Sequence, residues 1–434
     1  MFHFDLSQVG SDSRSDLEKV LDNQLKVLEQ KWGVPSSPGD YLPNRLSNLL
    51  RGAHAASGKG VVVLVDEYDK PLLNAIDNPD LKDEFKRVLK PFYSCFKSCD
   101  ADLKFVMLTG VARFGKVSIF SDLNQLFDIS FDRHFNAICG ISESELKTTF
   151  APSIENFAGA NDITPEQALE ELKKNYDGYH FAKPSQCEDI YNPFSLLNAL
   201  KSEQIGSYWF STGTPTFLIK ELIHRNFNFA TSRSIEVDPL TLTTTGVLEN
   251  DPEMTLFQAG YFTIKSYDPE AGTYCIGLPN REVESGFDKL ALELYTEHKS
   301  EFDFVKFNRD LIDGNPEGFM SRLKAYFKDF NYDTVRDTEF HYHNVLYILF
   351  KLLGFKSHSE YHTSDGRIDA LVKTLRFIYV LEFKLNQSAR AAIDQIDAKD
   401  YCGAFAADTR PVFKIGVNFT SATHSIDDYI IEPC

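Results

Sequence analysis

Asp369, Glu382 and Lys384 are ionisable residues set into two apolar stretches near the C-terminus, and their types and spacing could do chemistry. Carboxylate oxygens are the ligands that Mg²⁺ prefers, and the ion keeps its other positions for water and a substrate phosphate. A neighbouring ammonium group could orient the attacking water or stabilise the negative charge that develops on phosphorus. The three side chains therefore fit hydrolysis of a phosphate ester, and an exposed ion pair on a hairpin is the alternative.

Two strands must bring these residues together. The stretches 368–373 and 376–385 are short and rich in β-branched and aromatic residues, which favours strands over helices. We predict an antiparallel hairpin with a two-residue turn at 374–375, in which Asp369 lies opposite Val380. Because side chains alternate along a strand, this register would put Asp369 on the face that carries the other two ionisable residues.

Further elements are predicted on both sides of the hairpin. In chain order they are a helix, a strand, a second helix and a last strand, over residues 339–353, 355–363, about 387–401 and 411–420. The order with the hairpin included is α-β-β-β-α-β. Glu339 would open the first of these helices, and Gln395 would lie on one face of the second.

This order, with Asp on the second strand and Glu-x-Lys on the third, resembles the PD-(D/E)xK nuclease superfamily, although the Pro of its name is absent. The resemblance implies that Asp369 and Glu382 hold a divalent metal ion, Mg²⁺ or Mn²⁺, and that Lys384 is catalytic. It also implies that Glu339 completes the metal site. We add Gln395 to the candidate catalytic residues, and the substrate that the resemblance implies is nucleic acid, with DNA expected.

A second acidic pair ends an apolar stretch near the N-terminus. Residues 61–65 are all Val or Leu and run directly into Asp66 and Glu67. A buried parallel strand that ends in carboxylates has the form of a Walker B strand. Asp66 would then hold Mg²⁺ through water, and Glu67 would polarise the water that attacks a γ-phosphate.

The string Val-Leu-Val-Asp-Glu-Tyr-Asp-Lys-Pro-Leu at 63–72, together with 108–111 and 116–124, resembles the bacterial and archaeal AAA-ATPase-like family. Members of this family carry a PD-(D/E)xK domain at the C-terminus, so the resemblance spans nearly the whole chain. It implies that Thr109 and Arg113 are nucleotide-sensing residues. Members begin with a phosphate-binding loop, which is missing before the Walker B strand here, and we expect ATP to bind only if such a loop is supplied upstream.

One segment imitates that loop. Residues 110–117 match Gly-x4-Gly-Lys, but Val117 replaces the Ser or Thr that binds magnesium. β-Branched and aromatic residues follow instead of a helix N-terminus that could receive phosphate. We therefore interpret the segment as part of the sensor region.

The net charge of the 434-residue chain is −18, which argues against a protein whose whole surface attracts nucleic acid. The charge is unevenly distributed. Residues 301–434 carry 16 basic and 20 acidic side chains, a balance of −4, which leaves −14 for residues 1–300. These numbers fit a phosphate-handling C-terminal domain with an acidic N-terminal partner.

The expected compartment follows from what the sequence lacks. No apolar run approaches the roughly 18 residues of a membrane span, and the first residues do not form a signal peptide, so we expect a cytoplasmic prokaryotic protein without membrane contact. The seven cysteines are scattered and odd in number, which predicts reduced thiols and no zinc site.

Three regions are predicted within an α/β protein. Residues 1–140 form an AAA-type, P-loop-NTPase-like parallel-sheet core that lacks its Walker A segment. Residues 141–300 form a helical lid and a winged-helix-like connector, whose wing is a hairpin over 261–267 and 272–278. Residues 301–434 form the α-β-β-β-α-β restriction-endonuclease-like domain.

Three functions stay open at this stage. The first is a metal-dependent nuclease with an AAA-like regulatory domain. The second is an ATP-binding AAA-type switch whose C-terminal domain mainly binds, which requires the missing loop. The third is a non-catalytic interaction protein that uses the nuclease fold for binding. Association of identical subunits is open in each case.

Overall fold

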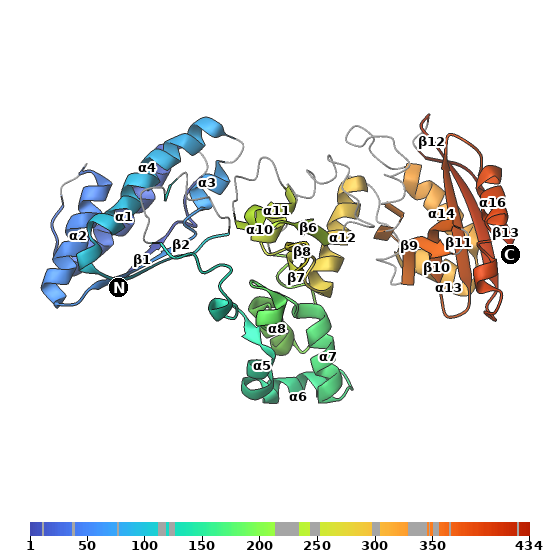
Figure 1. The fold of residues 1–434 in the computed structure, drawn as a ribbon, viewed down its shortest axis with the longest axis horizontal. Coiled ribbons are helices and arrows are strands. Elements are labelled where there is room, and N and C mark those ends of the chain that lie inside the picture. Colours follow the sequence, from blue (N-terminus) through green and yellow to red (C-terminus); the bar gives the residue numbers. More distant parts are fainter. Residues whose placement is uncertain are drawn as a thin grey trace. The chain divides into compact units, whose positions relative to one another are not determined.

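Figure 1 shows the fold of the chain in a computed structural model. The residues that the structure describes are 1–10, 13–36, 40–75, 78–111, 119–120, 126–212, 234–243, 252–296, 304–328, 345–346, 348–349, 356–363, 366–422 and 425–434. The chain divides into two compact units. One comprises Met1–Ile138, His180–Glu188 and Glu236–Ile276, and the other comprises Cys139–Tyr179, Asp189–Ile235 and Gly277–Cys434.

The N-terminal part of the chain forms a parallel three-stranded sheet, drawn in blue in Figure 1. Its strands, in order across the sheet, are β1 (Phe2–Asp5), β2 (Val61–Asp66) and β3 (Leu103–Leu108). Its helices are α1 (Arg14–Trp32), α2 (Leu42–Ser57), α3 (Lys70–Asn74) and α4 (Pro79–Ser98). Leu17, Leu21 and Leu25 recur every fourth residue along α1 and share one buried core with Phe2 and Phe4 of the sheet.

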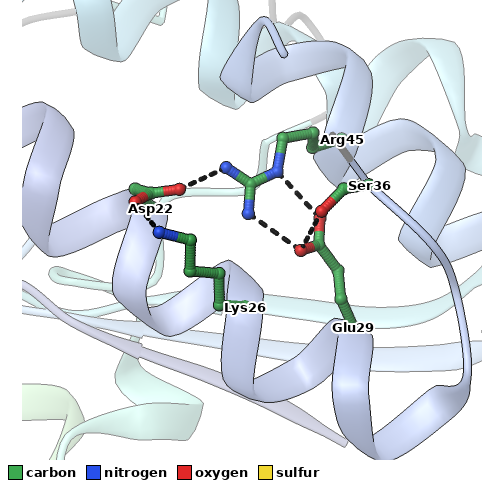
Figure 2. A network of polar contacts seen from close by, with 5 residues as sticks. All are labelled: Asp22, Lys26, Glu29, Ser36 and Arg45. Carbon is green, nitrogen blue, oxygen red and sulfur yellow. Dashed lines mark hydrogen bonds and ion pairs between the residues drawn. The ribbon is translucent and has the colours of Figure 1, made fainter. Parts of the chain in front are cut away.

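A buried ion network joins α1 to α2 (Figure 2). Arg45 of α2 donates two hydrogen bonds of 2.8 Å to the carboxylate of Glu29 on α1 and a third to Asp22, and Ser36 donates to Glu29 as well. The Arg45 and Glu29 side chains are only 4% and 6% exposed. Hydrogen bonding to Arg45 lowers the pKa of Glu29 despite its burial, so both groups are charged in the folded protein.

Four helices and a two-stranded antiparallel sheet follow in the second unit. The strands are β4 (Ile141–Ser142) and β5 (Ile190–Tyr191). The helices are α5 (Glu143–Thr149), α6 (Ala151–Ala160), α7 (Pro165–Tyr176) and α8 (Pro193–Ser202). Ser142 and Thr164 explain where α5 and α7 begin, because each of these side chains forms a capping box with the residue three positions on.

Asp177, directly after α7, is buried with one carboxylate oxygen unpaired. Its side chain is 3% exposed, Oδ1 has no hydrogen-bond partner, and the Lys173 ammonium lies 3.8 Å from Oδ2. Burial, and then the charge of Asp189, raise the pKa of Asp177 to about 6. Ionisation of this carboxyl group therefore costs free energy in the folded protein that it does not cost in the unfolded chain.

We expect Asp177→Asn to raise the free energy of unfolding at pH 8 by up to about 3 kcal/mol, from about 1.4 kcal/mol per pKa unit. Because the folded pKa is the higher one, the cost of the charge grows between pH 4 and pH 6 and is complete above pH 6. Urea unfolding at pH 8 and pH 4 measures the difference, which should nearly vanish at pH 4. Glu155→Gln, at an exposed site on α6, is the control. A variant that is no more stable than the wild type at pH 8 would contradict this account.

The connector region contains the predicted hairpin. Its elements are β6 (Ser234–Val237), α10 (Pro239–Thr243), α11 (Pro252–Gln258), β7 (Thr263–Asp268), β8 (Thr273–Gly277) and α12 (Arg281–Thr296). The strands form one sheet in the order β6-β8-β7.

The C-terminal part is a five-stranded sheet with helices. Its elements are α13 (Phe304–Asp313), α14 (Pro316–Lys328), β9 (Lys356–Thr363), β10 (Gly366–Lys373), β11 (Ile378–Leu385), α16 (Ala389–Ala398), β12 (Val412–Thr420) and β13 (Ser425–Pro433). The strand order is β13-β12-β11-β10-β9, in which β11 and β12 are parallel and the other neighbours antiparallel. The predicted β-β-β-α-β succession is present, and β13 is an addition. Of the preceding predicted helix, the structure describes only residues 345–346 and 348–349, which are helical and buried.

The predicted register of the β10–β11 hairpin is wrong by two residues. Lys373 pairs with Ile378 and Leu371 with Val380, so the turn has four residues rather than two. Thr374 explains the longer turn, because its hydroxyl accepts hydrogen bonds from the backbone N–H groups of Arg376 and Phe377. A shift of two residues leaves every side chain on its predicted face.

The prediction that every cysteine is a reduced thiol is also wrong. Cys402 and Cys434 form a disulfide, with Cα atoms 5.9 Å apart. The cause is β13, which runs antiparallel to β12 and returns the end of the chain to the segment between α16 and β12, where the Cys434 N–H donates to the Val412 carbonyl. The other cysteines, at positions 95, 99, 139, 187 and 275, are not part of a disulfide.

Within the described ranges, none of the helices is both long enough and apolar enough to span a membrane.

Candidate active site

Asp369 and Glu382 lie on neighbouring strands and interact. Ala370 of β10 pairs with Leu381 of β11, which places the preceding residue, Asp369, beside Glu382. The Asp369 carboxylate also accepts a 2.9 Å hydrogen bond from the backbone N–H of Phe383. The structure therefore brings the two predicted metal ligands together, in a closer register than the sequence predicted.

The two oxygens of the Glu382 carboxylate have different surroundings. Oε1 accepts hydrogen bonds from the Lys384 ammonium, at 3.0 Å, and from the side-chain amide of Gln395 on α16. Oε2 is buried and has no hydrogen-bond partner, and the whole residue is only 1% exposed. A buried carboxylate oxygen without a partner is costly unless something else binds it.

The electrostatics of the pair point to a cation. Burial, and then the negative charge of Asp369, raise the pKa of Glu382 to about 7, and Lys384 only partly opposes this shift. Two adjacent carboxylates, of which one is paired with a single ammonium group, have an excess of negative charge that a divalent ion would neutralise. Hard oxygen donors of this kind suit Mg²⁺ or Mn²⁺, so the residues fit such an ion.

Lys384 and Gln395, two further predicted residues of this site, both contact Glu382. Lys384, 13% exposed, is more accessible than Glu382, and its ammonium also donates to the Phe383 carbonyl at 3.1 Å. Gln395 reaches Glu382 from α16. Glu339 lies outside the described residues. Within the described part of the chain, no group of three or more His, Cys, Asp and Glu side chains is arranged to hold a metal. A third protein ligand would therefore have to come from elsewhere, as predicted for Glu339.

Asp66 is the last residue of β2 and Glu67 follows it, and of the two predicted sensing residues the structure describes only Thr109. The Thr109 hydroxyl donates a 2.6 Å hydrogen bond to the exposed carboxylate of Asp66, which joins the ends of β3 and β2. Glu67 has a left-handed backbone, with φ of 54°, and its N–H donates to Asp66. Arg113 lies outside the described residues.

Two family models match the chain. Residues 1–120 match AAA-ATPase_like, described as "Predicted AAA-ATPase", and residues 337–429 match PDDEXK_9, described as "PD-(D/E)XK nuclease superfamily". The fold and the site thus define a two-part α/β protein with an AAA-ATPase-like region and a nuclease-superfamily domain. Nucleases of this superfamily usually use divalent metal ions.

One curated relative is similar to this chain over nearly the whole of the chain's length. It is described as "Uncharacterized protein in vnfD 5'region", from Azotobacter chroococcum mcd 1, and is 34% identical over 429 residues, which cover 96% of this chain and 80% of the relative. The chain belongs to the family of this relative, that of AAA-ATPase-like proteins with a C-terminal PD-(D/E)XK domain. No solved structure matches the chain significantly.

Proposed function

We propose that the C-terminal domain hydrolyses phosphodiester bonds of nucleic acid, with DNA as the substrate, in a reaction that requires Mg²⁺ or Mn²⁺. The observation that carries the proposal is the buried, unpartnered Oε2 of Glu382 beside the carboxylate of Asp369. A bound cation would give this buried oxygen a partner and would offset the repulsion between the two carboxylates. A nuclease-superfamily domain at residues 337–429 supports the same substrate class.

Each residue has a role in this proposal. Asp369 and Glu382 would hold the ion, with Glu339 as a third ligand. The bound ion would supply Lewis-acid polarisation of the phosphate and charge neutralisation at the leaving oxygen. Gln395 fixes the orientation of Glu382 by its hydrogen bond to Oε1, and Lys384 places a positive charge where the negative charge on phosphorus develops.

The direct test is cleavage of linear duplex DNA, nicked DNA, single-stranded DNA and RNA by the whole chain in the presence of Mg²⁺ or Mn²⁺. We expect cleavage of DNA that stops when EDTA removes the ion and returns when the ion is added back. Wild-type protein that cleaves none of these substrates with either ion would overturn the proposal.

A second candidate function is nucleotide-dependent switching by the AAA-ATPase-like region of a cytoplasmic, self-associating protein. The observation that favours it is the Thr109–Asp66 hydrogen bond, which holds a Walker B-like carboxylate at the carboxyl ends of parallel strands.

For the 434-residue chain itself, we expect ATP affinity weaker than about 1 mM. Asp66 and Glu67 can hold magnesium and water, but residues 1–65 contain no Gly-rich loop ending in Gly-Lys-Ser/Thr to cradle the phosphates. Isothermal titration calorimetry with Mg²⁺–ATP measures the affinity. Micromolar binding that is lost in Asp66→Ala would show that this expectation is wrong.

A further inference from the structure

Three alternate residues of β12 hold α16 in place. Lys414, Gly416 and Asn418 are spaced by two along the strand, so their positions share one face of the sheet. Each of them contacts α16 or the segment that leads into it. We call these three residues the β12 seat. In the parallel register, Gly416 pairs with Glu382 and Asn418 pairs with Lys384 of β11, so the seat lies alongside the candidate active site.

Gly416 is the central point of the seat, where the helix lies directly on the strand. A Cβ atom at this position would come within 2.5 Å of the Ala389 carbonyl oxygen and 2.9 Å of Ile393 Cγ1. Contacts below about 3 Å to a backbone atom cannot be relieved by turning a side chain. Glycine in the middle of this strand is therefore explained by the close approach of α16.

Asn418 and Lys414, the other two residues of the β12 seat, bind the two ends of α16. Asn418 is 3% exposed, and its side-chain oxygen accepts a 2.9 Å hydrogen bond from the Gln387 N–H, just before the N-cap residue Ser388. Toward the other end of the helix, the Lys414 ammonium contacts both carboxylate oxygens of Asp397, at 2.7 and 2.8 Å. The position of the helix along and above β12 is therefore fixed at three points.

The contact between Gln395 and Glu382 depends on this position. Gln395 lies between the middle and the end of α16, and its amide must reach Oε1 of a carboxylate that lies on β11. If α16 moved outward, the amide would leave Glu382, and Oε1 would keep only its bond to Lys384. Misplacement of supporting groups by about 1 Å can cost about 100-fold in rate.

We propose that Gly416 is a positioning residue for the candidate active site: by lacking a side chain, it lets α16 come close enough for Gln395 to hold Glu382. Lys414 and Asn418 maintain that position from the two ends. The inference deepens the proposed nuclease function, on which it rests, and assigns to β12 a role that no motif in the sequence indicated.

The first experiment compares Gly416→Ala with the wild type. We expect kcat/KM for DNA cleavage to fall about 10- to 100-fold, with most of the loss in kcat, because substrate-binding groups are unchanged. Gly159→Ala on α6, where an added Cβ would meet no atom within 4 Å, is the matched control and should cleave like the wild type.

A double-mutant cycle with Gln395→Ala separates positioning from simple destabilisation. If Gly416 acts through Gln395, then Gly416→Ala should lower kcat/KM in the wild-type background and have almost no further effect in the Gln395→Ala background. The melting temperatures of the same four proteins, measured without metal, should also be non-additive: the change in the double variant should differ from the sum of the two single changes. Effects on kcat/KM that multiply across the two sites would overturn the proposal.

The outcomes also distinguish this proposal from the proposed function. If the wild type cleaves nothing, the nuclease function fails, and the melting cycle alone decides whether Gly416 positions the Gln395–Glu382 contact: non-additive changes support it and additive changes overturn it. If Gly416→Ala does not fold, Asn418→Ala and Lys414→Met loosen the ends of α16 without inserting atoms. Both should then lower kcat/KM, and again only while Gln395 is present.

Discussion

Glu382→Gln is expected to abolish DNA cleavage and, at the same time, to raise the melting temperature of the metal-free protein. We expect kcat/KM to fall by at least about 100-fold, because a neutral amide oxygen binds a divalent ion more weakly than a carboxylate does. Stability should rise by about 1 to 3 kcal/mol, because the substitution removes a buried charge that has one unpartnered oxygen and lies beside Asp369. The new amide could donate a hydrogen bond to Asp369 in place of that repulsion.

Lys384→Met provides the contrast to Glu382→Gln. It should also lose cleavage, but it should lower the melting temperature, because Oε1 of Glu382 loses a charged donor while the buried carboxylate remains. Opposite stability changes with the same loss of activity would be hard to explain by general misfolding. Asp428→Asn, at an exposed site on β13, is the control and should change neither property. Calorimetric melting in EDTA, together with the cleavage assay, gives both readouts, and a destabilised Glu382→Gln protein would contradict this account of the site.

The residues of the candidate site could be predicted because strand alternation is a local property. Alternation puts Glu382 and Lys384 on one face of their strand, and the predicted hairpin adds Asp369 to it. The observed register differs by two residues, an even number, so the shared face is retained. The register itself depends on the Thr374 hydroxyl, which stabilises a longer turn than the shortest one that the apolar pattern allows. A local pattern therefore fixes which face a side chain occupies more securely than it fixes which residue lies opposite.

The features that were missed depend on contacts between residues far apart in the chain. The disulfide joins Cys402 to Cys434 only because β13 adds to the sheet and returns the terminus to the segment after α16. Gly416 is one glycine within a strand, and the role that we propose for it follows only from the helix that lies on it. Neither the disulfide nor the role of Gly416 can be recognised in a short stretch of sequence, because both depend on how distant elements pack together.

Burial of the ion network on α1 and α2 could not be predicted either, and it leads to the second large effect. Arg45→Met is expected to lower the free energy of unfolding by about 3 to 5 kcal/mol at pH 7, since it leaves the buried Glu29 carboxylate without its charged partner. Arg14→Met is the matched control: Arg14 forms an exposed ion pair with Glu18, for which we expect a loss below about 0.5 kcal/mol.

The effect of Arg45→Met should depend on pH in a defined direction. Hydrogen bonding to Arg45 lowers the pKa of Glu29 in the folded protein, so the network contributes its full stability above the ordinary carboxyl pKa and loses it as pH falls through the lowered value. Urea unfolding at pH 7 and pH 3 should therefore show a smaller difference between Arg45→Met and the wild type at pH 3.

Removing the charges together tests the cause. If the loss arises from an uncompensated buried carboxylate, then adding Glu29→Met and Asp22→Leu to Arg45→Met should recover much of the stability, because an apolar contact between α1 and α2 replaces a broken ion network. A triple variant that is less stable than Arg45→Met would mean that the ions hold the helices by geometry that apolar side chains cannot reproduce. Urea unfolding of Arg45→Met and of the triple variant at pH 7 distinguishes the two results.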